Sequence, residues 1–320
     1  MARYVTAPRV SVIVPVYNKA PFLATALDSI VAAVRSYGDA ELIVVDHGST
    51  DGSRELLESR YAKEARIADF GGGTIAAVRN HGARLATGVV LSFIDADCVI
   101  PPNYLERLVE VLAATGAGAT GAEVVPPPAP GWVEDVWYRL HRRTADGEQE
   151  WIGSANLAVL RDAFDAVGGF DERLVTGEDT ELCQRLRDRG YRIYESKQLT
   201  AVHLDNAKTL GDFYRKELWR GLGMFGTVRA GTIDKPTVMT VAHVILCAAA
   251  VLVLAAAPWP VAPRLGAAAG LVLAVPAATL VYRGLGGGSV GRPLRALLLY
   301  EVYYAARAAA LARIMLRTTP

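Results

Sequence analysis

Residues 89–97 read Val89-Val-Leu-Ser-Phe-Ile-Asp-Ala-Asp97, an apolar run that ends on two carboxylates at alternate positions. A short apolar run of this kind is typical of a strand buried on both faces of a parallel sheet. The preceding chain repeats the pattern, with strands predicted at 10–16, 41–45 and 65–70 and helices at 21–36, 53–61 and 74–87. This strand–helix alternation predicts an α/β fold, with a mostly parallel sheet flanked by helices.

The chain beyond residue 100 is less regular. A helix is predicted at 104–115, and Pro126-Pro-Pro-Ala-Pro130 is a connector because proline fits neither a helix interior nor a central strand. Residues 131–150 are polar and aromatic, and we interpret them as a mobile lid. Ordered structure returns at 153–159, and a further helix is predicted at 180–189.

Composition places the chain among globular proteins. Hydrophobic residues make up 52% and charged residues 21% of the 320 residues, which is too apolar for a disordered chain. Cys98, Cys183 and Cys247 exclude a disulfide scaffold and share no metal-ligand spacing. Residues 236–320 carry a net charge of +6 and residues 1–235 a net charge of −5. The acidic body lacks the basic surface of a nucleic-acid-binding protein.

Residues 236–320 have the pattern of a membrane region. Thr237–Ala257 has no formal charge and only His243 interrupts it, and Leu265–Tyr282 is also uncharged. Both segments approach the roughly 20 residues needed to cross a bilayer core, and their short connector requires an antiparallel hairpin. A water-soluble helical domain is the alternative, but it should show a polar face, which both segments lack. We therefore predict two domains, residues 1–235 and 236–320, with spans at 237–257 and 265–282.

A third apolar segment, residues 294–317, is interrupted by Arg295, Glu301, Arg307 and Arg313. It could span the membrane, pack inside a helical bundle or lie at the interface. More arginines follow the second predicted span than lie between the two spans, so the positive-inside rule places residues 1–235 in the cytoplasm. The predicted protein is a multi-pass protein of the inner membrane.

Ligands of parallel sheets sit outside the carboxyl ends of the strands. Two carboxylates at i and i+2 after a strand can both approach a hard divalent cation, and Mg²⁺ or Mn²⁺ takes such ligands together with phosphate oxygens. A pair of solvated turn aspartates is the alternative, but the position after a buried strand favours the metal site. The strand ends carry Pro15, Tyr17 and Asn18, then Asp46, then Asp95 and Asp97.

Several of these residues allow both a functional and a structural interpretation. Asp46 could accept a hydrogen bond from a nucleotide base on which Tyr17 stacks, or the two could be an N-cap and the edge of the core. Arg79 could bind a phosphate or lie on the surface. Asp179 could be a general base or a helix cap, and His203 a metal ligand or a half-buried structural histidine.

Six motifs together resemble family-2 glycosyltransferases, in the order seen in that family and over residues 9–230. The motifs are Val12-Ile-Val-Pro-Val-Tyr-Asn18, Val44-Val-Asp-His-Gly-Ser-Thr-Asp51, Arg79-Asn80-His-Gly82, Phe93-Ile-Asp-Ala-Asp97, Val167-Gly-Gly-Phe-Asp171 and Gly177-Glu-Asp179. The resemblance implies the GT-A nucleotide-diphospho-sugar fold and a hexosyltransferase that inverts the anomeric carbon.

The resemblance also implies a role for each matching residue. Asp179 would be the catalytic base that deprotonates an acceptor hydroxyl, and Glu178, Gly169 and Phe170 would lie on the acceptor side. Asp97 would be the main ligand of Mg²⁺ or Mn²⁺, with Asp95 and His203 as further candidates. The implied donor-binding residues are Pro15, Tyr17, Asn18, Asp46, Arg79 and Asp95.

The resulting hypothesis is metal-dependent, inverting transfer of one sugar from a UDP-, GDP- or dTDP-sugar to a hydroxyl of an acceptor in the membrane or envelope. The predicted spans favour a lipid-linked acceptor. The Gln-x-x-Arg-Trp motif of processive synthases is absent, which weakens the case for a polymer synthase. The alternatives are a polyprenyl-phosphate glycosyl synthase, whose acceptor is the phosphate itself, and a catalytically silent GT-A scaffold. A nucleotidyltransferase should show a basic, glycine-rich loop where residues 16–20 carry only Lys19.

Overall fold

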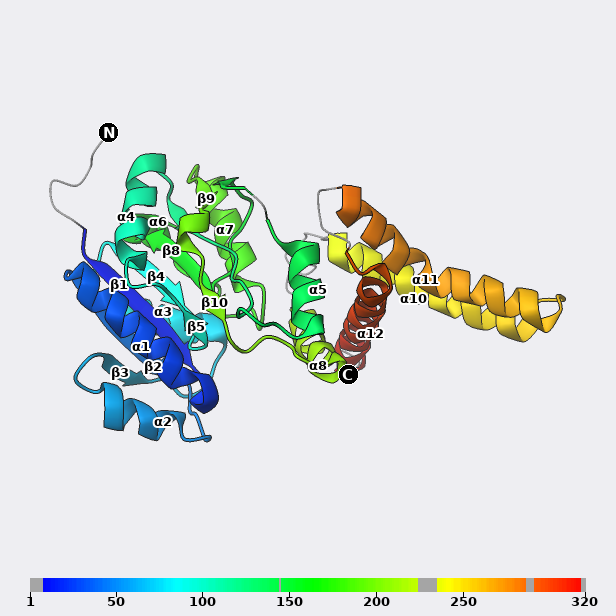
Figure 1. Cartoon of the computed structure of the whole chain (residues 1–320), viewed down its shortest axis with the longest axis horizontal. Coiled ribbons are helices and arrows are strands. Elements are labelled where there is room, and N and C mark those ends of the chain that lie inside the picture. The colour runs from blue at the N-terminus through cyan, green and yellow to red at the C-terminus, as the bar shows by residue number, and fades with distance from the viewer. Residues whose placement is uncertain (1–7, 144, 224–234, 286–290, 318–320) are drawn as a thin grey trace. The chain divides into compact units, whose positions relative to one another are not determined.

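The computed structural model describes residues 8–143, 145–223, 235–285 and 291–317 (Figure 1). The chain divides into two compact units. The first comprises Met1–Pro127 and Arg143–Asn206, and the second comprises Pro128–Arg142 and Ala207–Pro320. The domain boundary predicted at residue 235 does not coincide with the division of these units, which falls at residue 206 and sets Pro128–Arg142 in the second unit.

One large mixed sheet forms the centre of the first unit. Its strands and the two strands of a small ribbon are β1 (Val10–Val16), β2 (Ala40–Asp46), β3 (Arg66–Asp69), β4 (Val90–Ile94), β5 (Cys98–Val99), β6 (Ala119–Gly121), β7 (Gly147–Glu148), β8 (Asn156–Leu160), β9 (Ile193–Glu195) and β10 (Val202–His203). The sheet has the order β3-β2-β1-β4-β8-β6-β9-β7, and the ribbon pairs β10 with β5. β3, β2, β1 and β4 are parallel, as predicted, whereas β8 runs antiparallel to both of its neighbours.

Helices cover both faces of this sheet. They are α1 (Ala20–Tyr37), α2 (Ser53–Leu56) with the π-helical turn η1 (Leu57–Tyr61), α3 (Ile75–Leu85), α4 (Tyr104–Thr115), α6 (Arg161–Ala166), α7 (Glu178–Asp188) and the 3-10 turn η2 (Lys197–Leu199). Alternate β1 residues face opposite layers, because successive side chains of a strand point to opposite faces. Val12 and Val14 pack with α1 and α4, and Ile13 packs with α3, α6 and α7.

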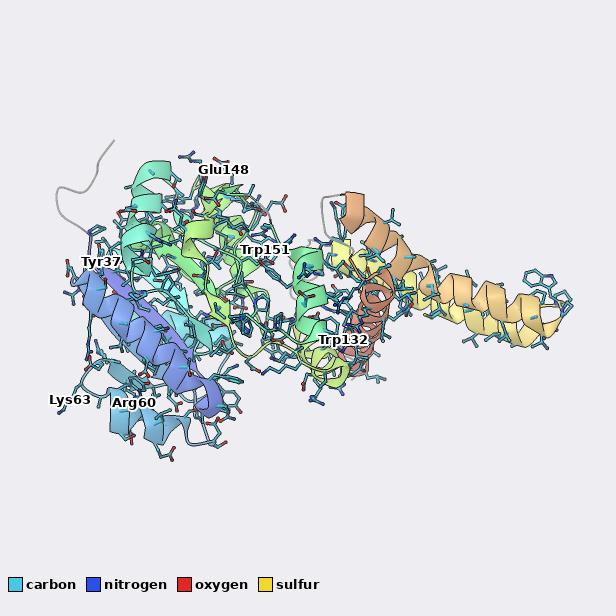
Figure 2. The ribbon with its side chains drawn as sticks, in the orientation of Figure 1. Tyr37, Arg60, Lys63, Trp132, Glu148 and Trp151 are labelled. Atoms are coloured by element: carbon cyan, nitrogen blue, oxygen red, sulfur yellow. The ribbon has the colours of Figure 1, made fainter. Side chains whose placement is uncertain are left out.

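The motif glycine Gly82 lets α3 lie directly on β1. A Cβ at this position would come within 2.4 Å of Ile13 Cγ2, so any larger residue would push the helix off the sheet. The close packing fixes the height of α3 above the strands. Arg79, one turn earlier on the same helix, is held at a defined depth in consequence. Beside α2, the exposed side chain of Lys63 points into solvent, whereas the guanidinium of Arg60 pairs with Asp28 of α1 at 2.5 Å (Figure 2).

The strand ends that were predicted to bind ligands lie at one edge of the sheet. Val16 is opposite Asp46 in the pairing of β1 with β2, and Ile13 is opposite Phe93 in the pairing of β1 with β4. Because β8 is antiparallel to β4, its first residue, Asn156, lies at this same edge. The edge therefore gathers loops from both halves of the first unit.

The second unit is helical. Its helices are α5 (Trp132–His141), α8 (Leu210–Gly221), α10 (Lys235–Ala256), α11 (Val261–Leu285) and α12 (Pro293–Arg317). The interpretation of residues 131–150 as an irregular lid is wrong for α5. Val133, Val136 and Leu140 recur at helical spacing and are buried, and Glu134 accepts a hydrogen bond from the Gly131 N–H at 2.8 Å. The same apolar face packs with α12, which explains why the unit begins before residue 235.

Among the described residues, α10 and α11 are long and apolar enough to cross a membrane by length and composition. Only 17% of the most apolar window of each helix is buried, whereas the core helix of a soluble protein would be mostly buried. They pack against each other as a hairpin. α12 covers the third predicted apolar segment and packs against α8, α5 and α11, with Leu299, Tyr300 and Tyr304 buried. Of the three alternatives given for residues 294–317, the structure shows packing inside a helical bundle.

Candidate active site

The two loops that follow β1 and β2 are joined at the edge of the sheet where base binding was predicted. The backbone N–H of Asn18, a residue with a left-handed φ of 51°, donates to Ser49 Oγ at 3.0 Å. Asn18 Oδ1 accepts from the Thr50 N–H at 2.8 Å, and the Lys19 N–H donates to Ser53 Oγ at 2.9 Å. These bonds tie the loop after β1 to the loop after β2. The side chain of Asn18 is thereby used to shape the loop.

Asp46 and Tyr17 are available to a ligand, while Pro15 is not exposed. Asp46 is buried, and its Oδ2 accepts from the Ser49 N–H at 3.1 Å. Its Oδ1 has no hydrogen-bond partner among the residues that the structure describes. Tyr17 is 57% exposed, which excludes it from the core edge. Pro15 lies inside β1 opposite Val45 and is buried, so it shapes the strand end rather than presenting a side chain.

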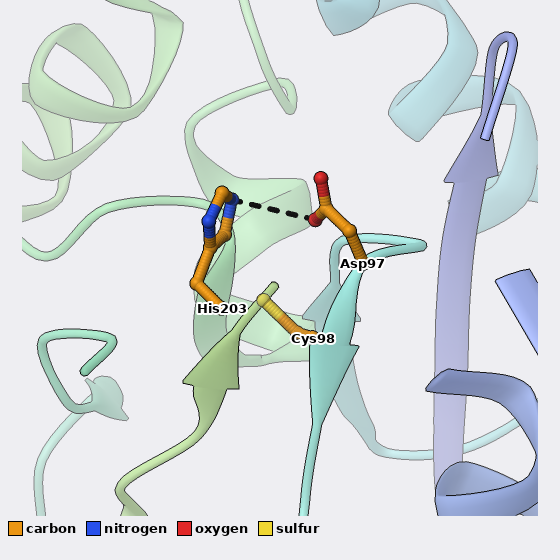
Figure 3. Close-up of side chains that lie close together, drawn as sticks. All are labelled: Asp97, Cys98 and His203. Atoms are coloured by element: carbon orange, nitrogen blue, oxygen red, sulfur yellow. Dashed lines mark ion pairs between the residues drawn. The ribbon is translucent and has the colours of Figure 1, made fainter. Parts of the chain in front are cut away.

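Asp97 is the more buried carboxylate of the predicted metal pair, and it faces a lysine and a histidine from two other parts of the chain. The Lys19 Nζ donates to Asp97 Oδ2 at 2.6 Å and to Asp205 Oδ2 at 2.8 Å. The other oxygen, Asp97 Oδ1, lies 3.4 Å from His203 Nε2 (Figure 3). Burial disfavours the ammonium, but Asp97 and Asp205 outweigh it and hold the pKa of Lys19 above its ordinary value. Lys19 is therefore charged at neutral pH.

Cys98 completes the group that could hold a metal ion. Ligand atoms of Asp97, Cys98 and His203 all lie within 4.8 Å of one another. Burial, with the charges of Asp95 and Asp97 adding to it, raises the pKa of the Cys98 thiol well above its ordinary value. Since the thiolate is the form that ligates metals, Asp97 and His203 are the better ligands. The antiparallel pairing of β10 with β5, which sets His203 opposite Cys98, brings the histidine here.

Arg79 links the strand-end aspartate to the start of α7. Its guanidinium donates from Nη2 to Asp95 Oδ1 at 2.8 Å and from Nη1 to Glu178 Oε1 at 2.7 Å. Arg79 is only 3% exposed, so the alternative of a surface arginine is excluded. Both of its terminal nitrogens bond to carboxylates. The donor-side carboxylate and the acidic pair of α7 therefore belong to one charge network.

Glu178 and Asp179 occupy different surroundings despite being neighbours. Glu178 is buried and also accepts from Ser154 Oγ at 3.1 Å. Burial raises the pKa of Glu178 although the Arg79 guanidinium opposes the shift. Asp179 is half-buried, and its Oδ2 accepts from the Ser154 N–H at 3.1 Å. Asp179 Oδ1 accepts from the Thr180 N–H at 2.8 Å. Glu178 is thus committed to the network, while Asp179 accepts from backbone N–H groups and keeps partial exposure to solvent.

The glycine-rich turn before α7 contacts the site through the backbone of Phe170 and through its ring, whose centroid lies 5.9 Å from the Arg79 guanidinium carbon. The amide of Asn80 forms two bonds of 2.9 Å with the backbone N–H and C=O of Phe170. The Phe170 ring is buried against Phe93 and Phe164, so it cannot contact an acceptor as the resemblance implied. Gly169 precedes it at a φ of 74°, a left-handed conformation that glycine adopts without strain. This turn positions the site rather than lining it.

Sequence reasoning missed Lys19, Asp205 and Ser154. Lys19 was the only basic residue in the loop after β1, directly beside the predicted nucleotide-binding edge, and this position was the available signal. Ser154 lies just before β8, and only the antiparallel placement of that strand brings it to α7. Nothing in the local sequence around Asp205 indicates its partner across the fold.

Comparison with known proteins assigns the family. The model of Glycosyl transferase family 2 matches residues 11–157, and that of Glycosyl transferase family group 2 matches residues 90–285. The chain belongs to glycosyltransferase family 2. It is 30% identical over 226 residues to glycosyltransferase AglE of Haloferax volcanii, covering 68% of this chain and 73% of the relative. It is 28% identical over 217 residues to succinoglycan biosynthesis protein ExoA of Rhizobium meliloti, covering 64% of this chain and 66% of the relative.

A solved structure supports the fold of this glycosyltransferase. The mannosyltransferase PcManGT from Pyrobaculum calidifontis, determined in complex with GDP-Man and Mn²⁺, aligns with a TM-score of 0.62 at 22% identity. The alignment covers 98% of this chain and 89% of that chain. The predicted GT-A fold and the assignment as a glycosyltransferase are therefore confirmed.

Proposed function

We propose that this glycosyltransferase transfers a single sugar, with inversion and with a divalent cation, from a nucleotide-diphosphate sugar to a hydroxyl group of an acceptor in the membrane or envelope. The observation that carries the proposal is the Arg79 bridge, because it joins Asp95 on the donor side to Glu178 beside the candidate base. One network thus spans from the end of β4 to the start of α7. Tyr17 and Asp46 are the proposed contacts for the nucleotide base.

The residues present fit a divalent cation. Asp97 Oδ1 is buried and has no hydrogen-bond partner within the described part of the chain, and His203 Nδ1 is in the same state. A carboxylate oxygen and an imidazole nitrogen are ligands that suit Mn²⁺, and the carboxylate also suits Mg²⁺. Asp97 and His203 would hold the ion, with Asp95 as a further candidate. A bound cation supplies positive charge to the departing nucleoside diphosphate.

Asp179 is the proposed base. An acceptor hydroxyl is a weak nucleophile until its proton is removed, and the base must reach that proton directly. Displacement of the diphosphate by a single hydroxyl inverts the anomeric carbon, so the base and the leaving group lie on opposite sides of it. Asp95 and Asp97 are assigned to the leaving-group side. Glu178 is buried and already accepts from Arg79 and Ser154, which leaves Asp179 as the open carboxylate of the pair.

The apolar hairpin of α10 and α11 supports an acceptor at a membrane. Most of its residues are not covered by protein, and exposed apolar surface of this extent is typical of a membrane or partner contact. We propose that the hairpin anchors the enzyme in the inner membrane, with the first unit in the cytoplasm and a lipid-linked saccharide as acceptor. The name of the relative ExoA, a succinoglycan biosynthesis protein, is in accord with an envelope polysaccharide.

The donor test uses the purified full-length protein in detergent. UDP-, GDP- and dTDP-sugars are screened for hydrolysis in the presence of Mn²⁺, Mg²⁺ or a chelator. We expect turnover with one nucleotide class and its loss in chelator. Fractionation of cells, followed by an alkaline wash, tests the anchor: the full chain should stay with the membranes. Recovery of the unwashed protein in the soluble fraction would contradict the spans.

The test of the base is Asp179→Asn. We expect transfer to fall by about 10³-fold, since general-base catalysis contributes roughly 10²–10⁴. The affinity for the nucleoside diphosphate, measured by calorimetry, should change by less than about twofold, because the base acts mainly in the transition state.

Asp188→Asn is the matched control, because it makes the same change at an exposed position of the same helix. If Asp179 were only a helix cap, its variant would instead lose about 1 kcal/mol of stability and keep its turnover. Loss of donor binding in the Asp179 variant would also contradict the assignment.

A further inference from the structure

The ammonium group of Lys19 pairs with the same carboxylate that a cation at Asp97 would use. Its Nζ lies 2.6 Å from Asp97 Oδ2, while the other oxygen, Oδ1, faces His203. The Asp97 side chain is only 2% exposed, and that of the lysine is 26% exposed. Asp205 is a second carboxylate partner of the ammonium, at 2.8 Å. In this arrangement Lys19 offsets part of the negative charge of Asp97 in the enzyme without donor.

The position of Lys19 is built into the backbone. The Lys19 N–H donates to Ser53 Oγ, and the next N–H, of Ala20, donates to Asp51 Oδ2 at 3.0 Å. Asp51 Oδ1 in turn accepts from the Ser53 hydroxyl at 2.6 Å. The side chains of Ser53 and Asp51 thus fix the backbone of Lys19, and only its flexible methylene chain is free to move the charge.

A divalent cation and the ammonium cannot share Asp97 without strong repulsion. Two like charges a few ångströms apart in a partly buried site repel each other much more than in water. Asp97 Oδ1 remains without a hydrogen-bond partner in the described residues, facing His203. A cation that enters beside His203 would therefore bind a carboxylate whose negative charge Lys19 already offsets in part.

We propose that Lys19 is an internal competitor for the divalent cation: it holds Asp97 until a nucleoside diphosphate arrives, and the cation then binds together with the diphosphate. This inference rests on the proposed metal dependence. The negatively charged phosphate groups can bind the ammonium in place of Asp97, while the backbone of Lys19 stays fixed. The consequence is that the cation binds weakly alone and tightly with nucleotide.

The test measures Mn²⁺ binding rather than turnover. Free Mn²⁺ is followed by electron paramagnetic resonance during titration of the full-length protein in detergent, with and without GDP or UDP. We expect Lys19→Met to bind Mn²⁺ about tenfold more tightly than the wild type when no nucleotide is present. A site that is competent for only a tenth of the time binds its ligand tenfold more weakly, and the substitution removes that restriction. The strengthening of Mn²⁺ binding by nucleotide should be correspondingly smaller in the variant.

Lys63→Met is the matched control, because it removes the same charge from an exposed position of the same unit (Figure 2). Its Mn²⁺ affinity should equal that of the wild type. Lys19→Gln is the second variant, and circular dichroism establishes that each protein is folded. Lys19→Gln should also bind Mn²⁺ more tightly than the wild type.

The outcomes separate this inference from the proposed function. If the wild type binds Mn²⁺ with nucleotide but neither Lys19 variant gains affinity without it, the competition is refuted and the metal site stands. If no sample binds Mn²⁺ under any condition while transfer continues, metal dependence and competition both fail, and Lys19 itself supplies the positive charge. An equal gain in Mn²⁺ affinity in Lys63→Met would show that the effect comes from net charge alone. That result would also overturn the proposal.

Discussion

Two carboxylates of this protein are equally buried but differ in how they are partnered. Asp97 in the first unit and Glu217 on α8 in the second are each only 2% exposed. Both oxygens of Glu217 accept from arginines, Oε1 from Arg220 at 2.5 Å and Oε2 from Arg307 at 3.1 Å. One oxygen of Asp97 accepts from Lys19, and the other has no hydrogen-bond partner within the described residues.

The difference separates a charge that serves the fold from one that serves a ligand. Burying a carboxylate is costly unless every lone pair is satisfied, so a carboxylate with an unused oxygen is kept for another reason. The arginines of Glu217 also outweigh burial and hold its pKa below the ordinary range. Glu217 joins α8 to α12, and Asp97 stands at a strand end where a diphosphate can approach.

The largest expected effect comes from the unsatisfied carboxylate. Asp97→Asn removes the charge that would hold the cation, and we expect turnover to fall by about 10³-fold, equivalent to roughly 4 kcal/mol of transition-state stabilisation. The melting temperature should stay within a few degrees, because asparagine retains the size and an acceptor oxygen. Initial rates of sugar transfer and thermal unfolding are measured on the same preparation. Near-normal turnover that persists in chelator would show that Asp97 is only a partner of Lys19.

The satisfied carboxylate should show the opposite behaviour. Glu217→Ala removes the carboxylate that pairs with Arg307, whose side chain is only 14% exposed, and breaking a buried pair in this way costs about 3 kcal/mol. We expect a clear fall in the unfolding temperature of the full-length protein in detergent. Turnover per folded molecule should not change, because both arginines that bond to Glu217 belong to the second unit. A large loss of turnover without loss of stability would contradict the contrast drawn between Glu217 and Asp97.

The fold could be predicted wherever one periodicity dominated. The strand predicted at 10–16 coincides with β1, and the helix at 104–115 coincides with α4, because each segment carries an unmixed pattern. α5 was missed because tryptophans and charged residues stand between its buried positions Val133, Val136 and Leu140. Its burial depends on α12, which lies more than a hundred residues later, and no local pattern contains that information.

The site could be predicted as a set of residue types but not as a network. Strand-end positions indicated Asp46, Asp95 and Asp97, and parallel pairing brings them to one edge. The bridge through Arg79 was not foreseeable, because it depends on how deeply α3 packs on the sheet and on where α7 begins. Lys19 was visible as a lone charge, but its pairing with Asp97 joins segments 78 residues apart.

The smallest expected effect concerns a titratable group of the second unit that, like Glu217, serves the fold. His141 on α5 donates from Nδ1 to the backbone oxygen of Trp137 at 2.9 Å, and its ring centroid lies 4.0 Å from that of Trp137. Burial, together with the charge of Arg283, lowers the pKa of His141 to about 4. The histidine is therefore neutral in the folded protein at pH 6.

The sign of the pH effect follows from this depressed pKa. The unfolded chain, with a histidine pKa near 6.5, binds a proton that the folded chain does not, so stability falls as the pH drops from about 6.5 towards 4. Because His141 keeps partial exposure, we expect a loss of about 1 kcal/mol per pH unit in this window, less than the 1.4 kcal/mol of a fully shielded group. Thermal unfolding at pH 7, 6 and 5 measures the loss.

His141→Gln should be less stable than the wild type at pH 7, but its stability should depend less steeply on pH. Turnover per folded molecule should be the same for both proteins at each pH. Equal slopes for the two proteins would mean that His141 is charged inside the fold, and would remove it from the group of purely structural residues to which Glu217 belongs.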